Sequence, residues 1–356
     1  MVVATEPPAL ARIDGLDVAR ALAFAGMLLA HYTRPIPGRG DPAWLASVVN
    51  VANGRAAPLF CVLLGLGAGI LSRGGTRNWV LVRRGVVLFA IGIAVWPYID
   101  EVYLILPHYG VLLALLPIAR LVPTRGLLPL AGAAFAVPAA IVALVDDHGL
   151  RATPQPDSYG ELFEGTYLVR ELSWGGGYPL VGWAGFALVG LWCSRQDLRR
   201  RSTVIGLLAG GVVVTALQPV LNVAFEGLDG NTANPDARGW SAFLDTSAHS
   251  NMTAWYVSSS ATAVAVIALC LLVVPRARTI LTPVRDLGRM ALTAYLGHLW
   301  LGVAVVFDWR HDELPTLDTQ LGVAALTLCG FVLGAFAWSR VFPRGPLEAV
   351  VRTVAR

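Results

Sequence analysis

An arginine and a histidine stand eleven residues apart in the first apolar stretch of the chain, Leu16 to Tyr32. At about 100° per residue, eleven steps of a helix return to within roughly 20° of the starting face, and at about 1.5 Å per residue they cover roughly 16 Å. Arg20 and His31 are therefore predicted to share one face of one helix. Because ionisable groups are costly in hydrocarbon unless they serve a function, this pair is the first candidate for chemistry.

His31 is the candidate catalytic base. Imidazole exchanges protons near neutral pH, and a base that takes a proton from a hydroxyl or amine lets that group attack an acyl carbonyl. The alternative is an interfacial histidine bonded to water or to a carbonyl. Asp17 lies three residues before Arg20 and can pair with it. The pair is either a structural salt bridge or the mouth of a donor channel, with Arg20 facing a phosphate or a thioester carbonyl.

Further histidines are candidates for binding substrate. His108 lies just inside the outer end of its span, close in sequence to Asp100 and Glu101. His249 closes a long loop, and His298 lies near the predicted membrane midplane. These side chains are expected to converge if their helices are neighbours.

The composition predicts a polytopic membrane protein. The chain has 356 residues, of which 56% are hydrophobic and 14% charged, and its mean hydropathy is +0.62. These values lie outside the usual range of soluble domains. Because apolar runs occupy the whole length, no separate soluble domain is expected, and residues 1–356 are interpreted as one membrane domain.

Apolar runs long enough to cross a bilayer predict an all-α, polytopic transmembrane helical bundle of about ten spans. The predicted spans are 15–33, 56–72, 79–98, 102–121, 126–145, 178–194, 203–224, 252–274, 288–307 and 320–339.

The arginines indicate the orientation. All 27 basic residues are arginine, and 19 of them fall on one side of the predicted spans against seven on the other, with Arg20 inside a span. The positive-inside rule places both termini, including segment 1–14, in the cytoplasm. The basic inner surface suits anionic membrane lipid or a phosphorylated donor.

Two predicted outer loops, about 146–177 and 225–251, are long enough to bind a ligand. They carry aromatic side chains such as Trp174 mixed with carboxylates and amides. That mixture is typical of a sugar-binding surface and equally of an interfacial aromatic belt.

Motifs for several other chemistries are missing. No two histidines stand three or four residues apart, so no metal site is expected. There is no Walker loop or GxSxG elbow. The glycines of the run Gly65 to Gly69 lie in a predicted span and are interpreted as helix-packing positions.

Several segments resemble a family of membrane acyltransferases. The Arg20-x10-His31 spacing and the run Gly54 to Gly65 resemble acyltransferase family 3. Later segments are more similar to YeiB-like bacterial membrane proteins of unknown function and to heparan-α-glucosaminide N-acetyltransferases. The segments that carry this second likeness are Gly176-Gly177-Tyr178-Pro179, His249-Ser250, Leu287 to Tyr295 and Gly345-Pro346-Leu347-Glu348.

The resemblance implies an integral O- or N-acyltransferase that moves an acyl group from cytoplasmic acyl-CoA, with acetyl-CoA the expected donor, to an extracytoplasmic glycan or glycolipid. His31 matches the catalytic histidine of the family and Arg20 its partner, with Asp17 beside them. Arg83 and Arg84 are the arginines expected to hold the CoA phosphates. The location implied is a bacterial cytoplasmic membrane, with cell-envelope glycan or lipid as partner.

Two other functions stay open from sequence alone. One is a proton-coupled transporter or flippase of an envelope precursor, with Arg20 and His298 lining its path. The other is a non-catalytic relative that binds lipid or glycan. No nucleic acid is expected among the partners, and a homodimer is one assembly to test.

Overall fold

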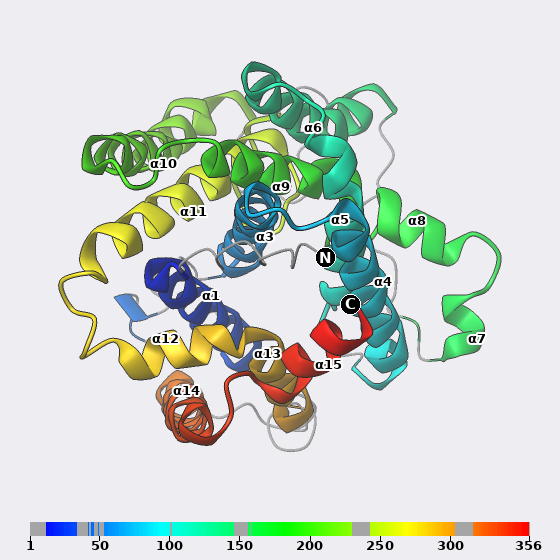
Figure 1. The fold of residues 1–356 in the computed structure, drawn as a ribbon. Coiled ribbons are helices and arrows are strands. Elements are labelled where there is room, and N and C mark those ends of the chain that lie inside the picture. The colour runs from blue at the N-terminus through cyan, green and yellow to red at the C-terminus, as the bar shows by residue number, and fades with distance from the viewer. Residues whose placement is uncertain are drawn as a thin grey trace, which may run out of the picture.

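The chain folds into helices. The computed structural model describes residues 12–33, 53–99, 102–145, 158–229, 243–302 and 316–355, with a few isolated positions between them. Within these residues there is no strand, so the predicted all-α class is confirmed (Figure 1). The helices are α1 (Asp14–Tyr32), α3 (Ala56–Arg73), α4 (Asn78–Val95), the 3-10 turn η1 (Trp96–Tyr98), α5 (Leu106–Ala119), α6 (Thr124–Val145), α7 (Tyr159–Leu162), α8 (Tyr167–Ser173), α9 (Leu180–Ser194), α10 (Arg201–Asp229), α11 (Thr253–Val273), α12 (Thr282–Arg289), α13 (Ala291–Leu301), α14 (Leu317–Val341) and α15 (Pro346–Val354).

Each of the ten predicted spans coincides with helical structure. By length and composition, six helices of the described chain could cross a membrane, namely α3, α4, α6, α10, α11 and α14. Helices α5 and α9 are apolar but shorter, and α1 carries three charged residues. The protein is therefore a multi-pass membrane protein, and a total of ten crossings stays a prediction.

Helix α3 lies at the centre of the bundle. Of its apolar window 67% is buried, against 11% for α10 and α14, which lie at the perimeter (Figure 1). Glycines let α3 approach α9 closely. A Cβ atom on Gly65 would lie 1.9 Å from the carbonyl oxygen of Ala187, and one on Gly190 would lie 1.9 Å from that of Val62. The predicted packing role is thus confirmed for Gly65.

The bundle has two chemically different ends. At one, which we call the arginine end, the start of α1 lies beside the end of α11, and Asp14 pairs with Arg278 at 2.8 Å. At the other, the histidine end, α1 carries His31 in its last turn and lies close to the start of α3, where Gly26 packs on Ala56. Since α1 runs from one end to the other, it is the natural link between them.

The predicted span 288–307 begins differently from the expectation. The helix is interrupted at Met290, so that α12 ends at Arg289 and α13 begins at Ala291. The Glu348 carboxylate accepts hydrogen bonds from the backbone N–H of Leu292 at 2.8 Å and of Thr293 at 3.2 Å. A carboxylate at a helix start satisfies donors that have no partner within the helix, which explains why a new helix begins here.

Candidate functional site

Two histidines from distant parts of the chain meet at the histidine end. His31, in the last turn of α1, and His298, in α13, lie with Nδ1 and Nε2 3.0 Å apart. Their rings are nearly parallel, at 12° and with centroids 5.2 Å apart. His298 is fully buried, whereas His31 is partly exposed. The pair therefore consists of one partly exposed imidazole in contact with one that is buried in the core.

Neighbouring side chains fix the orientation of His298. The Tyr32 hydroxyl donates to the carbonyl oxygen of His298 at 2.8 Å. The Phe24 ring meets the imidazole edge-on at 5.4 Å, and the Tyr295 ring lies 5.5 Å away. The backbone of His298 is held by this hydrogen bond and its ring by these contacts, which keeps Nε2 facing His31.

This arrangement can support general base chemistry. With its proton on Nδ1, His31 donates to His298 Nε2 and keeps its own Nε2 unprotonated. A hydrogen bond to one imidazole nitrogen sets the tautomer and so defines which nitrogen can accept a proton. In that tautomer His31 Nε2 is the nitrogen that can accept a proton, and the contact with His298 holds the tautomer.

The charged residues of α1 form a separate cluster at the arginine end. Asp17 is fully buried and pairs with Arg20, as the three-residue spacing predicts. It also accepts a hydrogen bond from Arg12 Nη2 at 3.0 Å. Arg20 Nε donates to the carbonyl oxygen of Gly288 at 3.3 Å. Arg20 and His31 thus share the face of α1 that packs on α12 and α13, but neither Arg20 nor Asp17 contacts His31.

Burial alone would lower the pKa of Arg12, which precedes α1. The hydrogen bond and the charge of Asp17 outweigh that effect, so that the pKa lies above its ordinary value. Arg12 therefore stays charged over the physiological range.

A cavity of about 370 Å³, which we call the arginine pocket, opens beside this cluster. Five arginines and one glutamate line it together with apolar and aromatic side chains. The lining residues are Arg12, Met27, Phe60, Arg84, Leu88, Ile105, Leu106, Tyr109, Arg289, Ala291, Leu292, Tyr295, Pro343, Arg344, Glu348, Val351 and Arg352. The charges come from chain segments at the arginine end, whereas Met27 and Tyr295 come from the middle of the bundle.

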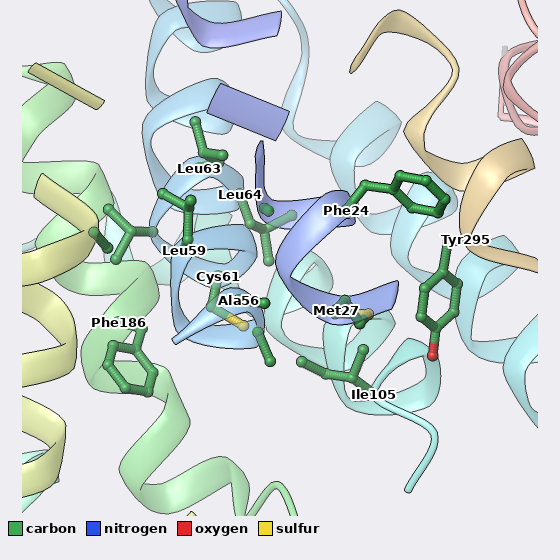
Figure 2. Close-up of a cluster of buried hydrophobic side chains, with 14 of the residues drawn as sticks. Phe24, Met27, Ala56, Leu59, Cys61, Leu63, Leu64, Ile105, Phe186 and Tyr295 are labelled. Carbon is green, nitrogen blue, oxygen red and sulfur yellow. The ribbon is translucent and has the colours of Figure 1, made fainter. Parts of the chain in front are cut away.

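The inner end of the arginine pocket lies one helical turn from the histidine pair. Met27 precedes His31 by four residues in α1, and Tyr295 precedes His298 by three in α13. Figure 2 shows Met27 and Tyr295 on the two helices, with the Tyr295 hydroxyl directed toward Ile105. The pocket therefore extends from a cationic mouth to the vicinity of the two imidazoles.

The two arginines expected to bind the donor point to different places. Arg84 lines the arginine pocket. Arg83 lies over the indole ring of Trp79, 4.2 Å from its centroid, and is not among the lining residues. The structure thus brings only Arg84 to the cavity.

Other expected substrate residues pack around Tyr178 and line a second cavity. His108 Nε2 is 3.4 Å from the carbonyl oxygen of Glu171, and the His108 ring packs on Tyr178. His249 lies near the Tyr178 ring as well. Trp174 and His249 line a second cavity, of about 300 Å³, at the histidine end. Asp100 and Glu101 lie outside the described residues.

Burial lowers the pKa of His249 from 6.5 to about 4. The imidazole therefore stays uncharged at neutral pH.

Several residues of the site were not singled out from sequence. Arg12, Arg289, Arg344 and Arg352 reach the arginine pocket, and Tyr295 closes its inner end. The sequence signal for these arginines was their clustering on one predicted side of the membrane. That signal does not indicate which clusters lie next to one another in the folded protein. Within the described chain, no group of three or more His, Cys, Asp or Glu side chains could hold a metal ion.

Two known protein families match parts of the chain. The family described as heparan-alpha-glucosaminide N-acetyltransferase, catalytic, matches residues 12–218, more than half of the chain. The chain belongs to this family. The chain is therefore a membrane N-acetyltransferase-like protein. The matched residues include α1 with His31.

The remainder of this N-acetyltransferase-like chain matches a second family. Residues 235–356 match a family described as proteins of unknown function, DUF418. A search of curated proteins found no match.

Proposed function

We propose that the protein transfers a short acyl group from acyl-CoA, bound in the arginine pocket, to a hydroxyl or amine of an acceptor at the histidine end. The observation that carries the proposal is the continuity of this pocket, which reaches from five arginines to Met27 and Tyr295, one turn from His31 and His298. A donor with a polyanionic end and a thioester end fits a cavity with this polarity.

The arginines suit the phosphates of the donor. Guanidinium groups bind phosphate oxygens through paired, charge-assisted hydrogen bonds. Within the described chain, Arg84 and Arg344 make no ion pair with a carboxylate, whereas Arg12 and Arg289 pair with Asp17 and Asp286. We infer that Arg84 and Arg344, together with Arg352 in the same pocket, bind the phosphates and that Arg12 and Arg289 shape the mouth.

The interior suits the pantetheine arm and the acyl group. Met27, Phe60 and Leu88 line it with apolar surface, while Tyr109 and Tyr295 add phenol groups. A mostly apolar interior excludes water from the thioester and so limits its hydrolysis.

The proposed reaction is a direct transfer. His31 Nε2 takes the proton from the acceptor hydroxyl or amine, and the acceptor attacks the thioester carbonyl carbon. The new C–O or C–N bond forms, the C–S bond breaks, and the CoA thiolate takes the proton back from the His31 imidazolium. Positioned general bases contribute about 10²–10⁴-fold to rate, and His298 supports the base by holding its tautomer.

The direction of transfer follows from the charge distribution. The arginine end carries the segments that the positive-inside rule assigns to the cytoplasm, where acyl-CoA is made. The acceptor is then an extracytoplasmic glycan or glycolipid of the cell envelope, and the membrane is a bacterial cytoplasmic membrane. Acetyl-CoA is the expected donor because the family is named for N-acetyl transfer.

The test compares wild type with His31→Ala and His298→Gln. Envelope glycans and lipids are isolated from a deletion strain that expresses each variant, and acylated species are quantified by mass spectrometry. We expect His31→Ala to lower acylation at least about 10²-fold and His298→Gln to lower it less, since it removes only the partner of the base.

Binding of acyl-CoA to the purified variants is the folding control, because neither histidine lines the arginine pocket. Wild-type levels of acylation in His31→Ala would contradict the proposal. Uptake of an envelope precursor into vesicles without acyl-CoA would instead favour a transporter.

A further inference from the structure

The second cavity lies at the histidine end, apart from the arginine pocket. We call it the His249 cavity. It adjoins the residue before α11, whereas the start of α1 packs on the far end of that helix. Its lining residues are Pro138, Ile141, Val142, Trp174, Pro179, Val181, Asp245, Ser247, Ala248, His249, Ser250, Asn251 and Met252.

The loop that forms one wall of this cavity is held in an unusual backbone conformation. His249 and Asn251 have φ values of +60° and +58°, in the left-handed region that L-residues seldom adopt. Such conformations persist only where the surrounding structure fixes them, and they are concentrated at ligand sites.

Two polar side chains fix the loop, the buried Asp245 and the partly buried Asn251. Asp245 accepts a hydrogen bond from the backbone N–H of Ser247 at 2.8 Å. Asn251 accepts hydrogen bonds from Trp183 Nε1 at 2.8 Å and from the Tyr256 hydroxyl at 3.2 Å, and its Nδ2 donates to the carbonyl oxygen of Gly177 at 3.3 Å. The wall is therefore rigid before any ligand arrives, which lowers the cost of binding.

His249 and Trp174 present unused binding groups to the cavity. The His249 ring packs near the rings of Tyr178 and Trp255, yet no residue of the described chain hydrogen-bonds to its nitrogens. As a neutral imidazole it offers one donor and one acceptor. The Trp174 side chain is 49% exposed and supplies an aromatic surface at the rim.

The chemistry of the lining selects the class of ligand. None of the described lining residues is an arginine, so a phosphate, sulfate or carboxylate would lack a counter-charge there. A hydrocarbon chain would leave the nitrogens of the His249 imidazole without partners. A sugar residue presents hydroxyls around its edge and a C–H face that can stack on an aromatic ring, which matches both parts of the cavity.

We propose that the His249 cavity binds a sugar residue of the acceptor, outside the reaction centre. The assignment of that sugar to the acceptor rests on the proposed function, whereas sugar binding itself can be measured without acyl-CoA. The occupied cavity would select acceptors by a part of the molecule that does not react.

The test measures binding of glucose, glucosamine, N-acetylglucosamine and maltose to the full chain in lipid nanodiscs. Detergents with sugar head groups are avoided because they would compete. We expect saturable binding of at least one sugar by saturation-transfer NMR, with a Kd of about 1 mM.

Two variants remove the proposed contacts. His249→Gly deletes the imidazole and accepts the positive φ without strain, and Trp174→Ala deletes the stacking surface. We expect each to weaken binding about tenfold, the effect of losing one buried contact. Trp44→Ala is the matched control, because Trp44 is 68% exposed and lines neither the arginine pocket nor the His249 cavity.

Absence of saturable binding for every sugar would overturn the inference, and so would binding that neither variant weakens. The two proposals can fail separately. Without sugar binding but with acyl transfer that depends on His31, the inference fails and the proposed function stands. With sugar binding but full acylation by His31→Ala, the proposed function fails and the cavity remains a sugar site.

Discussion

The imidazole of His31 shares a hydrogen bond with His298, a residue 267 positions away in the sequence. His298 accepts or donates at Nδ1 of His31 and thereby sets the tautomer of that imidazole. The three-residue spacing of Asp17 and Arg20 predicted their ion pair, because neighbours on a helix are fixed by local geometry. The pairing of His31 with His298 could not be predicted, since it depends on which helices pack together.

Two adjacent arginines give the sharpest test of the donor site. Arg84 lines the arginine pocket, whereas its neighbour Arg83 lies over Trp79. We expect Arg84→Gln to raise the KM for acyl-CoA by about tenfold or more, because a charge-assisted hydrogen bond is worth about 1.5–3 kcal/mol.

In the same assay, Arg83→Gln is expected to change KM less than about twofold, as for other exposed charges. Equal effects of the two substitutions would show that the pocket does not distinguish them and would remove the phosphate assignment from Arg84.

At the scale of the elements, close contact between α3 and α9 depends on missing side chains. Gly65 faces the α9 backbone directly, whereas a Cβ on Gly67, two residues later, would meet nothing within 4 Å. We expect Gly65→Ala to destabilise the protein by at least about 1–3 kcal/mol through overpacking. Gly67→Ala should leave stability unchanged or slightly raised, because alanine favours the helix.

Thermal unfolding of both variants in the same detergent measures this difference. A Gly65→Ala protein as stable as the Gly67→Ala protein would contradict the packing described for α3 and α9.

Hydropathy predicted where the helices lie but not how they end or meet. Each apolar run coincides with helical structure because the cost of unpaired backbone groups in lipid acts locally on every span. The break at Met290 was missed because its cause, Glu348, lies 58 residues further along the chain. The arginines of the pocket were likewise predicted to share a side, but not a cavity.

For the whole molecule, the opposite chemistry of the two ends predicts a fixed orientation. Ala248 lies in the wall of the His249 cavity, and Arg276 follows α11 at the arginine end. Single cysteines at these positions, in a Cys329→Ser background, report which side each faces, because the other three cysteines are buried.

We expect Ala248→Cys to react with a membrane-impermeant maleimide in whole cells, and Arg276→Cys to react only after permeabilisation. The reverse pattern would place the arginine end outside and would contradict a cytoplasmic donor.

The residues that line the arginine pocket come from both of the regions that match known families. Arg84 and Met27 belong to the region that matches the acetyltransferase family, whereas Tyr295, Arg344 and Arg352 belong to the region described only as of unknown function. His31 and His298 are divided in the same way. Neither region carries a complete pocket or histidine pair, so the region without an assigned function contributes half of the candidate machinery. A fragment cut at the boundary would lose both.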